Sequence, residues 1–147
     1  MSESDPTASA EALAAIVPKL RRRLREHGSL GDLTPSQVAV LLRIERDGPA
    51  TAARLAQAES MRPQSMSAIV AALQEQDFLE SSPDPNDGRQ AILSLTASCK
   101  KRIKSNRAAR RDWLSHLIRT KLTTAEQKQL AQSIELLQRL ADDPERP

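Results

Sequence analysis

Residues 62–73 constrain the fold of this chain more than any other stretch. Their four bulky apolar residues follow a helical i, i+3, i+4, i+7 spacing: Met66, Ile69, Val70 and Leu73. This spacing predicts a helix with one buried stripe. Pro63 suits the first position of such a helix, because the N–H that proline lacks would have no helical partner there. The stretch therefore predicts a helix that begins near residue 63 and packs one face on a core.

The opposite face of this helix is short, polar and nearly uncharged at its N-terminal end. It carries Gln64, Ala68, Ala71 and Glu75, with Ser65 and Ser67 at its flanks. Small side chains allow the helix axis to approach a large partner, Gln and Ser can bond to base edges, and a helix N-terminus offers N–H groups to phosphate. One interpretation is a recognition helix that enters a DNA major groove. The other is a surface helix that happens to be small and polar, and this stretch alone does not distinguish them.

The elements before this helix complete a helix-turn-helix. A capping box at residues 34–37 begins a helix that ends before Gly48. Thr51 can cap a short helix over residues 52–58, and a brief turn at 59–61 leads into the next helix. This turn contains no glycine. Either a non-glycine residue in it adopts an unusual backbone conformation, or the turn is longer.

A β-hairpin is predicted directly after the helix-turn-helix. Strands are expected over residues 78–82 and 89–95, on either side of a Pro-Asp-Pro-Asn-Asp-Gly loop. A hairpin in this place is a wing, and Arg89 lies near its tip, where a guanidinium could enter a narrow minor groove. Asp84 and Asp87 are near enough in sequence to orient Arg89. The alternative is an ordinary hairpin with an exposed arginine.

Amphipathic helices are expected towards both ends of the chain. Apolar periodicity over residues 9–26 predicts one helix, which Pro18 is expected to bend. Thr96 can cap a long helix over 97–121, whose first half is mostly Lys, Arg and Ala and is expected to bury little. A second capping box begins the last helix, which completes the segment 97–141. The remaining residues are predicted to form a disordered N-terminus, 1–8, and a frayed tail, 142–147.

Composition limits the class of protein. The net charge of +3 permits a polyanion partner without proving one. The chain has one Trp, one Phe and no Tyr, so its core must be aliphatic, which favours helices. The N-terminus lacks the basic and apolar regions of a signal peptide, and no apolar run is long enough to span a bilayer. A cytoplasmic protein without a membrane partner is expected.

The sequence offers no chemistry typical of an enzyme. It contains no Ser/His/Asp grouping, Gly-rich phosphate loop or Cys/His metal spacing, so no catalytic residue, metal or cofactor is predicted. The single cysteine, Cys99, excludes an internal disulfide and fits a reducing compartment. A thiol in the first helical turn beside Lys100 and Lys101 could have a lowered pKa. A redox switch is therefore an alternative to the more usual inert thiol of a lone helical cysteine.

The order of these elements resembles the MarR family (multiple antibiotic resistance regulators). The resemblance depends on residues 62–67 of the central helix and on residues 84–90 of the wing, followed by an aliphatic strand and the Thr96 cap. It covers roughly residues 10–141. It implies a mainly α fold with a small β-hairpin wing, in which a single domain over 9–141 contains a winged helix-turn-helix at about 34–96. The helices at about 9–26 and 97–141 would interlock in an obligate homodimer.

The resemblance also implies which residues contact DNA. Pro63, Gln64, Ser65 and Ser67 match groove-facing positions, and Ala68 shares their face of the helix. Arg62 matches a phosphate or base contact, Arg89 the minor-groove arginine, and Asp87 the residue that steadies it. The expected protein is a homodimeric, sequence-specific DNA-binding transcription regulator, most simply a repressor, at a pseudo-palindromic site in double-stranded DNA. Many members of the family also bind small aromatic or phenolic anions between the dimer helices and the winged lobe.

One alternative function remains open. The chain could be a helical dimer that acts as a protein-interaction or small-molecule-binding module with a vestigial wing. This alternative predicts no salt-sensitive binding to duplex DNA, whereas a regulator's affinity should fall linearly with salt on logarithmic axes.

Overall fold

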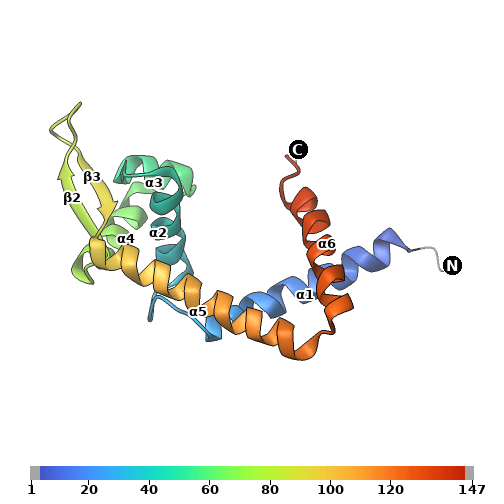
Figure 1. The fold of residues 1–147 in the computed structure, drawn as a ribbon. Helices are drawn as coiled ribbons and strands as arrows, with labels where there is room; N and C mark the ends of the chain where they lie inside the picture. Colours follow the sequence, from blue (N-terminus) through green and yellow to red (C-terminus); the bar gives the residue numbers. More distant parts are fainter. Residues whose placement is uncertain (1–3, 145–147) are drawn as a thin grey trace. The chain divides into compact units, whose positions relative to one another are not determined.

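The chain folds into two groups of elements, and each is described on its own. A computed structural model describes residues 4–144 (Figure 1). One unit comprises residues 28–107, and the other combines the described residues up to His27 with those from Ala108 onward. Helix α5 (Ala97–Lys121) contributes residues to both units. None of the helices within residues 4–144 combines the length and hydrophobicity needed to cross a membrane.

The unit of residues 28–107 is a helix-turn-helix followed by a wing. Its elements before α5 are α2 (Pro35–Asp47), β1 (Ala50–Thr51), α3 (Ala52–Ala58), α4 (Pro63–Glu75), β2 (Leu79–Pro83) and β3 (Ala91–Leu95). The strands form an antiparallel sheet in the order β1-β3-β2, and the β2–β3 hairpin projects from one end of the unit (Figure 1). The helix-turn-helix and the hairpin confirm the prediction. Strand β1 was not predicted. It pairs with β3 and adds a third strand to the sheet of the wing.

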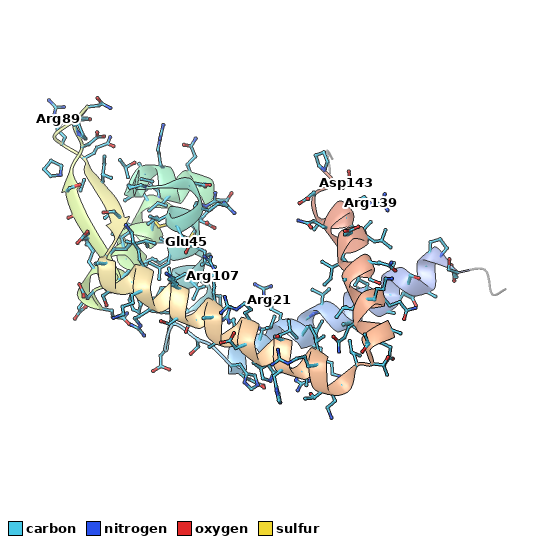
Figure 2. All side chains as sticks on the ribbon, in the orientation of Figure 1. Arg21, Glu45, Arg89, Arg107, Arg139 and Asp143 are labelled. Carbon is cyan, nitrogen blue, oxygen red and sulfur yellow. The ribbon has the colours of Figure 1, made fainter. Side chains whose placement is uncertain are left out.

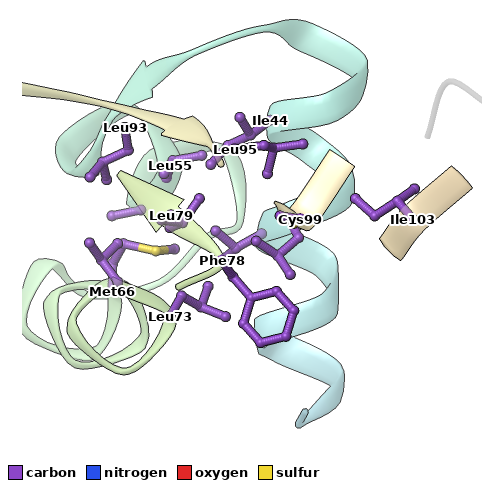
Figure 3. Close-up of a cluster of buried hydrophobic side chains, with 14 residues drawn as sticks. Ile44, Leu55, Met66, Leu73, Phe78, Leu79, Leu93, Leu95, Cys99 and Ile103 are labelled. Carbon is purple, nitrogen blue, oxygen red and sulfur yellow. The ribbon is translucent and has the colours of Figure 1, made fainter. Parts of the chain in front are cut away.

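A single, largely aliphatic core holds this unit together (Figure 3). Its buried residues are Val40, Leu41, Ile44, Leu55, Ala56, Met66, Val70, Leu73, Phe78, Leu79, Leu93, Leu95, Cys99 and Ile103. The predicted stripe of α4 is confirmed, because three of its residues belong to this set and Ile69 is half-buried against them. Burial of such side chains supplies most of the free energy that stabilises a fold of this size. The core therefore fixes which face of α4 remains outside.

The first half of α5 takes part in this core, contrary to the expectation that it buries little. Cys99 and Ile103, four positions apart on one helical face, are almost completely buried. Arg102 places its guanidinium carbon 4.7 Å from the ring centroid of Phe78 and donates a hydrogen bond from Nη2 to the carbonyl of Leu30 at 3.1 Å. A long basic side chain can cover apolar surface with its stem, so a basic composition did not prevent packing.

The other unit consists of α1 (Pro6–Glu26), the second part of α5 and α6 (Thr124–Ala141). The Asp5 carboxylate accepts a hydrogen bond from the N–H of Thr7, so α1 begins at Pro6 and continues through Pro18. Residues 6–8 are thus helical, although residues 1–8 were predicted to be disordered. Residues 1–3, and residues 145–147 of the predicted tail, lie outside the described part of the chain.

Two contacts and one capping box organise this second unit. The Trp113 ring stacks on His27 with ring centroids 4.2 Å apart, and the guanidinium carbon of Arg23 lies 5.2 Å from the same ring. The predicted capping box is present, with Thr123 and Glu126 each accepting a hydrogen bond from the other's N–H. Neither α1 nor α6 contains a fully buried residue. Large apolar side chains on these helices are therefore exposed: Ile16, Val17, Leu20, Ile134, Leu136, Leu137 and Leu140.

Candidate nucleic-acid interface

Helix α4 presents its polar face outward because its apolar face is held by the core. Met66 and Leu73 are fully buried. The predicted contact residues of this helix are all exposed: Arg62, Pro63, Gln64, Ser65, Ser67 and Ala68. Pro63 occupies the first position of the helix, and Arg62 is its N-cap residue but makes no capping hydrogen bond through its side chain. The first turns of α4 therefore offer backbone N–H groups, an amide and hydroxyls at the surface, without an acidic side chain.

The turn before α4 follows the first of its two expected alternatives, an unusual backbone conformation at a non-glycine residue. Ser60 has a φ of 54°, in the left-handed region. The N–H of Met61 donates to the carbonyl of Ala56 at 2.8 Å, and the N–H of Glu59 donates to the carbonyl of Leu55 at 3.0 Å. These bonds close the end of α3 so that α4 starts after a short connection. Ser60 thus serves where many such turns would use a glycine.

The loop of the wing is held by hydrogen bonds between its own residues. The carboxylate of Asp84 accepts from the N–H of Asn86 at 2.9 Å, and the carboxylate of Asp87 accepts from the N–H of Arg89 at 3.1 Å. The N–H of Asp84 also donates to the carbonyl of Gln90 at 3.0 Å, which closes the loop at its base. Asp87 therefore contacts the backbone of Arg89, and no bond from Asp87 to its guanidinium is present. Arg89 itself is exposed near the end of the hairpin (Figure 2).

Two cations of this surface remain available to an anion. Within residues 4–144 the side chains of Arg62 and Arg89 form no ion pair and no hydrogen bond. The predicted contact residues thus fall into two groups of the same unit, one on the first turns of α4 and one in the β2–β3 loop. An exposed guanidinium without a carboxylate partner can bind phosphate oxygens or base edges at little cost. Nothing in the described residues groups three or more metal-ligating side chains.

Thr96 links the wing to α5, and the sequence predicted only half of its role. Its hydroxyl accepts a hydrogen bond from the N–H of Cys99 at 3.0 Å, which is the expected cap. The same hydroxyl donates to the carbonyl of Asp77 at 2.7 Å, in the turn between α4 and β2. Asp77 also has a left-handed backbone, with a φ of 63°. The buried side chain of Thr96 therefore connects the turn after α4 to the start of α5, at the base of the wing.

Cys99 does not fit the redox alternative. Its side chain is fully buried in the core. Burial raises the pKa of the Cys99 thiol, because a thiolate would lose its hydration, and the charge of Arg102 opposes this only in part. Lys100 and Lys101 lie on the exposed side of the helix. The suggestion that they lower this pKa is therefore wrong.

Comparison with known proteins places these features in a family. The sequence model described as MarR family matches residues 33–91, which include α2–α4 and the loop of the wing. An HTH-type transcriptional regulator of Mycobacterium bovis is 32% identical over 143 residues, covering 97% of this chain and 99% of the relative. A relative from Mycobacterium leprae, also described as an HTH-type transcriptional regulator, is 31% identical with the same coverage.

Solved structures share the fold. A crystal structure of a Pseudomonas aeruginosa protein described as a transcriptional regulator has a TM-score of 0.80 at 30% identity and covers 97% of this chain and 99% of its own. A variant of Staphylococcus aureus MepR, bound to an oligodeoxyribonucleotide, has a TM-score of 0.70 at 18% identity and covers 90% of this chain and 97% of its own. The named relatives are regulators and not enzymes. The chain belongs to the MarR family of winged helix-turn-helix transcriptional regulators.

Proposed function

We propose that the protein is a homodimeric repressor that binds a pseudo-palindromic operator in double-stranded DNA. The observation that carries the proposal is the outer face of α4, where Gln64, Ser65, Ser67 and Ala68 are all exposed and small or uncharged. A solvated helix face would normally carry Lys and Glu at such positions. The MepR variant bound to an oligodeoxyribonucleotide supports the choice of DNA as the partner.

Each group of the interface has a separate role in this proposal. Helix α4 enters the major groove, where the Gln64 amide bonds to a base edge and Pro63, Ser65, Ser67 and Ala68 allow close approach. Arg62 binds a phosphate or a base at the entrance of the groove. Arg89 enters the adjacent minor groove, where the negative potential favours a guanidinium. Asp87 supports Arg89 through the loop backbone, since its carboxylate accepts the N–H of Arg89.

A second copy of the chain is the partner that the exposed helices α1 and α6 require. Their uncovered side chains include Leu140, 67% exposed, and Val17, 52% exposed. Apolar surface of this kind on two helices of one unit is typical of a protein–protein interface. A two-fold dimer presents two copies of α4 to one duplex. The half-sites of its operator are then about one helical turn, roughly 10 bp, apart.

Repression follows if the dimer occupies a promoter and blocks the polymerase. The family resemblance supports a further element, a small aromatic or phenolic anion that lowers the affinity for DNA by changing the spacing of the two α4 helices. Such a ligand acts only if it binds the two spacings with different affinity.

The test is site selection from a random duplex library with the purified full-length protein, followed by titration of the selected site at several salt concentrations. We expect log affinity to fall linearly with log salt. Arg89→Ala should weaken specific binding by about 1–3 kcal/mol, and Gln64→Ala should change the selected sequence more than the control Lys104→Ala does. No salt-sensitive duplex binding by a dimeric protein would instead favour the protein-interaction or small-molecule-binding module.

A further inference from the structure

The surface where the helix-turn-helix meets the wing is hollowed in two adjoining places, which together we call the depression. The two hollows measure about 350 Å³ and 460 Å³ and share Thr51, Ala53 and Gln90 as lining residues. The first extends towards Val70 and Gln74 of α4. The second lies between α3 and the loop of the wing. All of these residues belong to the unit of residues 28–107.

The second hollow has a polar lining with one cation. Helix α3 contributes Arg54 and Gln57, and the wing contributes Asp84, Asn86 and Gln90. Arg54 is the only Lys or Arg that lines either hollow. Its side chain is exposed and forms no ion pair within the described residues. The carboxylate that shares the hollow, Asp84, already accepts a hydrogen bond from the N–H of Asn86.

The position of this depression matters once the proposed function is accepted. If α4 occupies a major groove and Arg89 the adjacent minor groove, the sugar–phosphate strand that divides the two grooves must cross the surface between them. On that arrangement the strand passes the hollow between α3 and the loop of the wing, which Arg54 lines. A phosphodiester there needs a donor that can neutralise its charge, and a guanidinium is suited to phosphate because it can donate two parallel hydrogen bonds.

We propose that Arg54 binds a backbone phosphate of the operator, in the strand that runs between the two grooves. Gln57 and Gln90 add neutral donors on either side of the same hollow. This inference rests on the proposed function, and it adds a DNA contact from α3 to those expected from α4 and the wing. A phosphate contact carries no sequence information, so Arg54 contributes affinity and register without contributing base preference.

Salt dependence distinguishes this role from the others. Each neutralised phosphate contributes about 0.9 to the slope of log affinity against log salt. We expect Arg54→Gln to reduce the magnitude of that slope by about 0.9 and to lower affinity about fivefold to tenfold at 0.1 M salt. The loss should be similar on the selected operator and on an unrelated duplex. Arg54→Lys should retain most of the slope, because it keeps the charge.

The experiment uses the full-length protein, the two duplexes and at least four salt concentrations. Lys104→Gln, which removes an exposed charge of α5 that does not line the depression, is the matched control and should leave the slope nearly unchanged. The thermal unfolding of each variant is compared with the parent, and Arg54→Gln should unfold at the same temperature because its side chain is exposed. The proposal is overturned if Arg54→Gln leaves slope and affinity unchanged, if Lys104→Gln reduces both equally, or if Arg54→Gln changes the selected sequence. Absence of salt-sensitive binding by the parent would instead overturn the proposed function itself.

Discussion

Arg43 of α2 donates a hydrogen bond from Nε to Oε1 of Glu59 at 2.6 Å, next to the turn that leads into α4. The two side chains are only 27% and 21% exposed. Glu59 is the C-cap residue of α3 and directly precedes Ser60. This ion pair adds a side-chain contact to the backbone hydrogen bonds that hold the connection between α3 and α4, where α4 has no side-chain cap of its own. It links the stability of α2 to the placement of the candidate recognition helix.

We expect Arg43→Gln to destabilise the protein by about 1 kcal/mol, since it leaves a half-buried carboxylate without its cation. Urea unfolding followed by circular dichroism measures the change. Arg46→Gln is the matched control, because Arg46 pairs with Asp47 in a far more exposed position and its loss should have no measurable effect. Equal midpoints for Arg43→Gln and the parent would show that the contact with Glu59 contributes no net stability.

Cys99 should behave as an inert core residue. Because it is fully buried and its thiol pKa is raised, the reactive thiolate is scarce and inaccessible in the folded protein. A thiol-specific disulfide reagent should modify the native chain no faster than the chain unfolds, and modification should become rapid in denaturant. Treatment with peroxide should leave duplex binding unchanged. Fast modification of Cys99 in the native protein, accompanied by loss of duplex binding, would instead support a redox switch.

The elements that the sequence predicted well are those determined by neighbouring residues. The capping box of Thr34 and Gln37 depends on positions three apart, and both of its hydrogen bonds are present, at 2.9 Å and 3.2 Å. The stripe of α4 likewise follows from helical periodicity. The unusual backbone in the turn before α4 was one of two expected alternatives, because residues 59–61 contain no glycine.

What the sequence could not predict depends on contacts between distant segments. Strand β1 is two residues long and exists because Ala50 and Thr51 pair with Leu93 and Ile92, a partnership without a local signal. The link from Thr96 to Asp77 is equally distant in the chain. The candidate contact residues were correctly expected at the surface, but their contact with DNA stays a prediction. Arg54 was not among the predicted contact residues, because only the fold places it beside the wing.

Dimerisation should depend on the exposed apolar face of α6. Ile134 and Leu137 are 50% and 40% exposed. Since fully burying such a side chain contributes about 1.5–3 kcal/mol, covering the exposed part contributes roughly 1 kcal/mol per side chain in each copy. The double substitution Ile134→Glu with Leu137→Glu should therefore convert the protein to a monomer in sedimentation velocity. It should also weaken operator binding, because the two copies of α4 are no longer held together. Gln138→Glu, on the same helix and also exposed, is the control and should remain dimeric. A dimer that survives the double substitution would place the interface elsewhere.

The left-handed backbone of Ser60 predicts that the substitution Ser60→Gly stabilises the protein. A residue with a Cβ at a φ of 54° incurs a strain of about 1–2 kcal/mol that glycine avoids, and glycine's larger unfolded-state entropy offsets part of this gain. We expect Ser60→Gly to raise the free energy of unfolding by roughly 0.5–1 kcal/mol. Gly48→Ala is a control in the opposite direction. Its φ of 91° with a ψ of 177° is a conformation essentially restricted to glycine, and no heavy atom would lie within 4 Å of an added Cβ, so its expected loss of about 1–3 kcal/mol comes from backbone strain. Urea unfolding of both variants checks the pair, and destabilisation by Ser60→Gly would mean that the serine makes the turn more stable than its backbone conformation implies.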